Sequence, residues 1–145
     1  MGITPFTKQQ LLPQEEKLEI ARHKSELFIG IPKETSYQER RICLTPDAVN
    51  SLTSHGHRVL IESGAGASSS YSDKEYSDAG AEITNDTKKV FHCPMILKVE
   101  PLTMDEIEMI KQQTIVISAI QLKTRKAEYF QALSLGQNNV LRGFR

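Results

Sequence analysis

The chain has 145 residues, 39% of them hydrophobic, and its 18 basic side chains balance its 18 acidic ones. This length suits one domain of ordinary size with a real core. Balanced charge gives no field that attracts nucleic acid, and the apolar runs are too short for a transmembrane helix or a secretory signal. We therefore expect a cytoplasmic protein without a nucleic-acid partner and without membrane insertion.

Residues 1–26 form a polar N-terminal extension in which hydrophobic residues recur at helical spacing. Pro13 suits the first turn of a helix, and Leu18 and Ala21 then lie on one helical face. The pattern predicts a helix over residues 13–24, appended outside the core.

Residues 27–136 alternate short apolar runs, rich in β-branched residues, with segments of helical pattern. Repeated strand–helix–strand units with continuous apolar strands predict an α/β domain with a mainly parallel open sheet and helices on both faces. This is a Rossmann-like or flavodoxin-like layer, without a dinucleotide fingerprint. The predicted strands are residues 27–31, 57–62, 81–84, 95–99 and 114–119.

Capping signals mark where several of the intervening helices begin. Thr45 places a hydroxyl before a proline at the first helical position. The segments that begin at Ser72 and Thr103 have the capping-box form, with a glutamate three residues later. A last helix is predicted over residues 124–133, and residues 137–145 form an irregular C-terminal tail.

The carboxyl ends of parallel strands lie at one edge of the sheet, so the residues that follow each strand converge in space. Arginine offers a planar fork of donors that fits a carboxylate, lysine adds a point charge, and glutamine adds a carbonyl and an amide. Such a set suits a small carboxylate ligand. The predicted substrate-binding residues are Arg41 after the first strand, Lys98 after the fourth and Gln121 after the fifth.

The loop after the first strand reads I-G-I-P-K-E from Ile29 and E-R-R-I-C-L-T-P from Glu39. Over residues 27–135 the chain resembles the N-terminal domain shared by alanine dehydrogenases and the α subunit of proton-translocating transhydrogenases. The resemblance implies hydride transfer between NAD(H) or NADP(H) and a 2-oxo acid or amino acid in the complete enzyme. It also implies that Arg41 binds the substrate carboxylate; the residues alone allow an exposed loop arginine paired with Glu34 or Glu39.

Two positions depart from the pattern of this family. Alanine dehydrogenases typically read K-V-K-E-P, with the second lysine acting on the substrate carbonyl, whereas this chain reads K-V-E-P from Lys98. Lys98 either takes over that role by a shift of register or is the structural lysine of the motif, so it is a catalytic candidate and not a secure one. Gln121 stands where the family has a proton-transferring histidine, and glutamine orients a carbonyl but cannot act as a general acid or base.

No cofactor or metal site is expected in this chain alone. Gly64-Ala65-Gly66 follows a predicted strand, but Ser69 stands at the third glycine position and no helix begins directly after it, so a tight turn is the preferred interpretation. The four histidines lack metal-binding spacing. Cys43 and Cys93 form no C-x-x-C pair and are read as core thiols.

Three hypotheses about function follow. In the first, the chain is the substrate-side domain of an alanine dehydrogenase/transhydrogenase-like oxidoreductase, lacks the NAD-binding domain and is inactive alone. In the second, it is a non-catalytic binding or regulatory module that pairs with a nucleotide-binding chain. In the third, it is a truncated or frameshifted product without independent function, because the periodic pattern stops after Leu135. Expected partners are a small carboxylate and a nucleotide-binding domain or chain, and homo-oligomerisation is left open.

Overall fold

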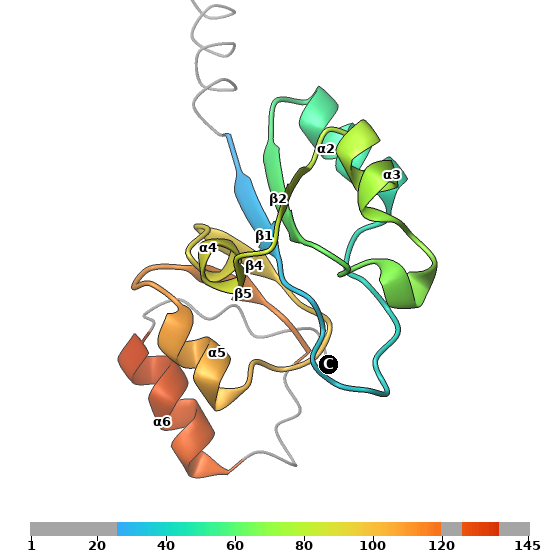
Figure 1. The fold of residues 1–145 in the computed structure, drawn as a ribbon. Helices are drawn as coiled ribbons and strands as arrows, with labels where there is room; N and C mark the ends of the chain where they lie inside the picture. The colour runs from blue at the N-terminus through green and yellow to red at the C-terminus, as the bar shows by residue number, and fades with distance from the viewer. Residues whose placement is uncertain (1–25, 120–125, 137–145) are drawn as a thin grey trace, which may run out of the picture.

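The computed structural model describes residues 26–119 and 126–136, which build one parallel sheet covered by helices (Figure 1). The sheet is five-stranded, with the order β3-β2-β1-β4-β5, and every pairing is parallel. This order is that of the first five strands of the doubly wound Rossmann sheet. The strands are β1 Phe28–Ile31, β2 Arg58–Glu62, β3 Glu82–Thr84, β4 Met95–Leu97 and β5 Ile115–Ile117.

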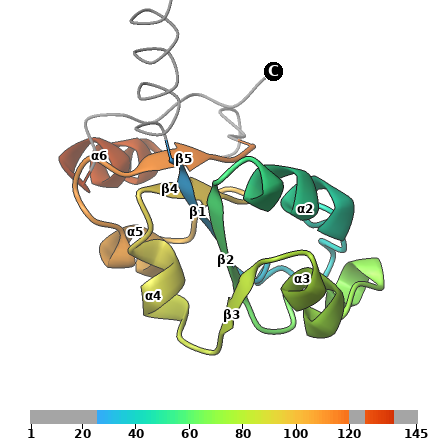
Figure 2. The same cartoon turned by 90° about the horizontal axis from the view of Figure 1, so that it is seen from above.

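Helices lie on both faces of the sheet, with α2 and α3 on one side and α4, α5 and α6 on the other (Figure 2). Right-handed crossovers require this distribution when the chain adds strands first on one side of β1 and then on the other. The helices are α2 Pro46–Ser54, the short 3₁₀ helix η1 Ala67–Ser69, α3 Asp73–Asp78, α4 Thr87–Phe91, α5 Met104–Met109 and α6 Ala127–Gly136.

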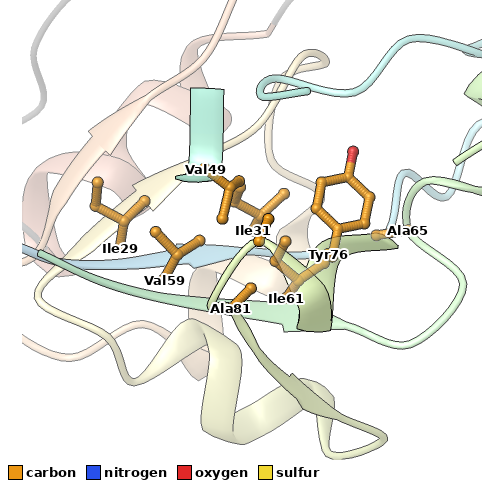
Figure 3. Close-up of a cluster of buried hydrophobic side chains, with 9 residues drawn as sticks. Ile29, Ile31, Val49, Val59, Ile61, Ala65, Tyr76 and Ala81 are labelled. Carbon is orange, nitrogen blue, oxygen red and sulfur yellow. The ribbon is translucent and has the colours of Figure 1, made fainter. Parts of the chain in front are cut away.

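The first core cluster fills the space between the sheet and the helices α2 and α3 (Figure 3). Alternate residues of a strand point to opposite faces, so β1 and β2 each contribute two large aliphatic side chains to this side. The ring of Tyr76 is fully buried, and its hydroxyl donates a hydrogen bond to the Leu44 carbonyl at 2.8 Å, which ties α3 to the chain entering α2. The cluster includes Ile29, Ile31, Val49, Val59, Ile61 and Tyr76.

On the other face, Gly30 allows α4 to approach β1 closely. A Cβ atom at Gly30 would lie 2.5 Å from the Val90 carbonyl oxygen and 3.0 Å from the Cβ of Cys93. Val90, Cys93 and Leu60 form a small buried cluster at this contact. The glycine of the I-G-I-P-K-E segment is therefore explained by packing. A larger cluster joins β4 and β5 to α4, α5 and α6 through Phe91, Ile96, Leu102, Ile107, Val116, Tyr129 and Leu133.

The strand order reverses between β1 and β4, because the chain builds β2 and β3 on one side of β1 and then crosses back to β4. In open α/β sheets, ligands bind beyond the carboxyl ends of the strands at such a switch point. The loops of residues 32–45 and 98–103 leave β1 and β4 at this point. The fold therefore brings together the two segments that carry Arg41 and Lys98.

The predicted fold class and all five predicted strands are confirmed, with strand ends that are one or two residues shorter in most cases. Helix starts at Pro46, Asp73 and Met104 follow the capping signals. The predicted helix over residues 13–24 and the tail of residues 137–145 lie outside the described residues. Among the described helices, none is long and apolar enough to cross a membrane.

Candidate functional site at the carboxyl edge of the sheet

Glu34 connects the loop after β1 with the loop after β4. Its Oε1 accepts a hydrogen bond from the Val99 backbone N–H at 2.6 Å, and its Oε2 accepts a longer one from Glu100 at 3.4 Å. Burial raises the pKa of Glu34 despite these bonds and the nearby Lys98 ammonium, which act in the opposite direction. The glutamate of the I-G-I-P-K-E segment thus joins two loops 65 residues apart.

Lys98 is the first residue after β4, and its side chain is only 1% exposed. The ammonium Nζ lies 3.1 Å from Glu106 Oε2 and 3.5 Å from Glu34 Oε2. It also donates to the Pro101 carbonyl at 3.4 Å. The three donors of a lysine thus have three partners inside the protein. We call Glu34, Lys98 and Glu106 the buried triad; a role for Lys98 towards a substrate stays a prediction.

The capping box of α5 positions the second carboxylate of the buried triad. Glu106 is the third residue of the helix, and its Oε2 accepts the Thr103 backbone N–H at 2.8 Å. The Thr103 hydroxyl in turn accepts the Glu106 backbone N–H at 3.2 Å. One carboxylate therefore serves both the helix cap and the buried lysine. The sequence marks Glu106 as a capping residue, but the same signal gives no hint of its second partner.

Arg41 lies in the loop after β1, with a side chain that is 77% exposed. Its Nε donates to Glu39 Oε1 at 2.8 Å and its Nη2 donates to Glu39 Oε2 at 2.7 Å, which is a bidentate pair. The Arg41 backbone N–H donates to Glu39 Oε1 as well, at 2.8 Å. Hydrogen bonds from Arg41 lower the pKa of Glu39 to about 2. Pairing with Glu39 is one of the two alternatives that the residues allowed; contact with a substrate stays a prediction.

Cys43 lies close to the buried triad but is not activated by it. Burial, and secondarily the charge of Glu34, raises the pKa of the Cys43 thiol to about 12, so the thiol stays protonated near neutrality. Burial also raises the pKa of Cys93 to about 11. Neither cysteine has the electropositive surroundings of a reactive thiolate.

The Gly64-Ala65-Gly66 segment forms a turn whose inward N–H is already bonded to a carboxylate. Gly64 adopts φ +78°, a conformation that glycine tolerates, and its N–H donates to Asp73 Oδ1 at 2.9 Å. Asp73 Oδ2 accepts the Ser63 hydroxyl at 2.6 Å, and this bond lowers the pKa of Asp73. The Gly64 N–H therefore already has a partner within the protein, and the predicted turn is confirmed.

Gln121 lies outside the described residues. Within the described ranges there is no group of three or more histidine, cysteine, aspartate or glutamate side chains that could hold a metal ion. A separate groove of about 520 Å³ lies against α2 and α3 and is lined by acidic residues, among them Asp47, Glu75 and Asp78. Neither Arg41 nor Lys98 lines that groove.

A family model described as "Alanine dehydrogenase/PNT, N-terminal domain" matches residues 30–142 of this chain. The alanine dehydrogenase of Bacillus subtilis (strain 168) is 38% identical over 107 residues, which are 74% of this chain and 28% of that protein. The alanine dehydrogenase of Methanococcus maripaludis is 40% identical over 97 residues, or 66% of this chain and 26% of that protein. The chain thus corresponds to little more than a quarter of the length of these relatives.

Two solved structures share the fold, with 27% and 28% sequence identity to this chain. A structure of L-alanine dehydrogenase superposes with a TM-score of 0.75 at 27% identity, and covers 80% of this chain and 32% of its own. The transhydrogenase from Sinorhizobium meliloti superposes with a TM-score of 0.67 at 28% identity, and the match covers 79% of this chain and 34% of that one.

Proposed function

Because this chain belongs to the alanine dehydrogenase/PNT N-terminal domain family, we propose that it forms the substrate side of an alanine dehydrogenase/transhydrogenase-like oxidoreductase. Its carboxyl edge would bind the carboxylate of a 2-oxo acid or amino acid. The observation that carries the proposal is Arg41, a solvent-exposed guanidinium in the loop after β1 that lies near enough to Glu34 and Glu100 for their charges to act on it. Arginine at such a place suits a planar carboxylate.

NAD(H) or NADP(H) would be held by a separate nucleotide-binding domain or chain and would supply the hydride. In the glycine turn after β2, Asp73 already binds the Gly64 N–H at 2.9 Å. Without a bound and oriented nicotinamide, no hydride transfer occurs at the carboxyl edge. These 145 residues alone should therefore give no NADH oxidation above background with pyruvate and ammonium. Measurable oxidation by the purified chain would contradict this assignment.

Substrate binding is the direct test of the role of Arg41. We expect saturable binding of pyruvate in roughly the millimolar range, about −4 kcal/mol, measured by titration of NMR chemical shifts. Arg41→Lys keeps the charge but removes the fork, and should weaken binding at least tenfold. Arg58→Lys is the matched control, because Arg58 also forms a two-donor pair with a glutamate, Glu82, but at the amino ends of β2 and β3. Equal affinities of Arg41→Lys and the wild type would refute the proposal.

A second candidate function is a non-catalytic binding or regulatory module that associates with a nucleotide-binding chain. It is favoured by Lys98, whose ammonium lies between two carboxylates with a side chain 1% exposed, which leaves it no free donor for a substrate. Arg41 would then serve recognition without chemistry. Gel filtration of this chain with a nucleotide-binding relative separates the candidates. A stable complex that binds pyruvate but does not oxidise NADH supports the module, whereas turnover by the complex supports the enzyme.

A further inference from the structure

The guanidinium of Arg41 has two hydrogen-bonding edges, and hydrogen bonds from the described residues occupy one of them. A guanidinium carries five N–H groups in a fixed plane. Nε and one N–H of Nη2 are bonded to the two oxygens of Glu39, at 2.8 Å and 2.7 Å. One N–H of Nη1 and the second N–H of Nη2 form the outer edge of the fork. That edge has the geometry to bind a second carboxylate by two parallel hydrogen bonds.

Glu39 is itself held in place. Its side chain is only 7% exposed, and it accepts the Arg41 backbone N–H in addition to the guanidinium. The neighbouring backbone is fixed from η1, because the Ser69 hydroxyl donates to the Arg40 carbonyl. With a pKa of about 2, Glu39 stays ionised at every pH near neutrality. The pair is therefore present whenever the protein meets a ligand in that range.

We propose that Glu39 is a positioning residue: it fixes the inner edge of the Arg41 fork so that the outer edge is presented to the carboxylate of the substrate. The inference rests on the proposed function, because it gives Arg41 a ligand. A free arginine side chain has many rotamers and must be ordered when it binds. Ordering one such side chain in advance corresponds to about a 2- to 10-fold gain in affinity.

The adjacent arginine shows what the pairing changes. Arg40 is exposed, and no ion pair links it to a carboxylate among the described residues. It has the same chemistry as Arg41 at nearly the same place, without a partner that fixes its plane. A substrate that needs two parallel hydrogen bonds should therefore select Arg41, and Arg40→Lys should leave pyruvate affinity unchanged.

The test uses the full chain and pyruvate as the probe, with Glu39→Gln, Arg41→Lys and the double variant. Glutamine keeps the size of Glu39 but loses its charge and its second acceptor. We expect Glu39→Gln to weaken pyruvate binding 2- to 10-fold and to broaden the Arg41 Nε–Hε NMR signal. The double variant should bind no more weakly than Arg41→Lys alone, since both changes act on one fork. Glu82→Gln, which breaks the Arg58 pair, is the control and should not change the affinity.

Unchanged or tighter binding by Glu39→Gln, with binding still lost in Arg41→Lys, would overturn this inference and leave the proposed function standing; Glu39 would then compete with the substrate. Failure of the wild type to bind pyruvate, or equal binding by Arg41→Lys, would defeat the proposed function itself. Urea unfolding of each variant checks that it is folded. Should Glu39→Gln unfold, Glu39→Asp replaces it, because the shorter side chain cannot reach both nitrogens and should weaken binding over the same range.

Discussion

Two groups of ion-paired side chains follow the strands at the carboxyl edge of the sheet. They differ in how exposed the cation is and in how far apart the partners lie along the chain. In the buried triad the Lys98 side chain is 1% exposed and lies between one carboxylate from the loop after β1 and one from helix α5. In the other group the Arg41 side chain is 77% exposed and pairs with a carboxylate two residues away. The first joins distant segments of the chain, whereas the second organises only its own loop.

The difference in exposure between Arg41 and Lys98 determines which cation is accessible to a ligand. A buried ion pair stays in place because removing either charge leaves the other without compensation in a medium of low polarity. The Arg41 guanidinium is largely solvated although its partner Glu39 is not, so it can bind a further partner at small cost. The buried triad therefore holds the loops of this edge together, and the exposed Arg41 is the group that we propose for substrate binding. Substitutions of Lys98 and of Arg41 should therefore differ in their effect on stability.

The largest effect is expected from Lys98→Met. The substitution keeps the length of the side chain but leaves Glu34 and Glu106 as uncompensated buried carboxylates, which costs about 3–5 kcal/mol of unfolding free energy. Urea unfolding at pH 7 measures this loss. Arg41→Met is the matched comparison, and its midpoint should fall less, because only one carboxylate, Glu39, loses a partner and the guanidinium itself is 77% exposed. A Lys98→Met protein as stable as Arg41→Met would show that the triad does not hold the edge together.

A smaller difference in unfolding free energy is expected between substitutions at two helix caps of the same form. Thr103→Ala and Ser72→Ala each remove a hydroxyl that accepts a backbone N–H at 3.2 Å within a capping box. Loss of such a cap costs about 0.5–2 kcal/mol. We expect Thr103→Ala near the upper end, because its partner Glu106 also holds Lys98, and Ser72→Ala near the lower end, because Glu75 has no buried cation. Equal midpoints in urea would mean that the cap of α5 does not support the triad.

The sequence predicts most of this fold because its signals are local. Apolar β-branched runs mark all five strands, and the hydroxyls of Thr45, Ser72 and Thr103 mark three helix starts. The helix α4 was expected only as a connection between strands. It is five residues long, too short for a helical repeat to be visible, although Asp86 caps it with bonds to two backbone N–H groups.

The site is less predictable, because its geometry depends on contacts between distant residues. The position of Arg41 and its pairing with Glu39 could be proposed from a loop of a few residues. The burial of Lys98 could not, since it requires Glu34 from the loop after β1 and Glu106 from the first turn of α5. A lysine at a strand end looks equally suited to a substrate or to a buried pair until those partners are placed.

The last prediction concerns two carboxylates five residues apart whose pKa values shift in opposite directions. The pKa of Glu39 falls from its ordinary 4.5 to about 2, because Arg41 donates to it. Its contribution to stability is therefore present above about pH 4.5 and lost as the pH falls towards 2. The pKa of Glu34 rises above 4.5 because of burial, so its contribution is present below that pH and lost as the pH rises through the folded value.

Urea midpoints measured from pH 3 to pH 7 should reveal these opposite signs. Relative to the wild type, Glu39→Gln should lose less stability on acidification, because it lacks the Glu39 carboxylate whose stabilising contribution the wild type loses in acid. Glu34→Gln should lose more stability on acidification than the wild type. Its stability relative to the wild type should be highest at the upper end of the pH range, where the wild type must keep Glu34 ionised in a buried place. Parallel pH profiles for the two variants would contradict the opposite pKa shifts of Glu34 and Glu39, because they would place both carboxylates in the same electrostatic environment. There would then be no reason to treat Glu34 as a structural residue and Glu39 as the partner that presents Arg41 to a ligand.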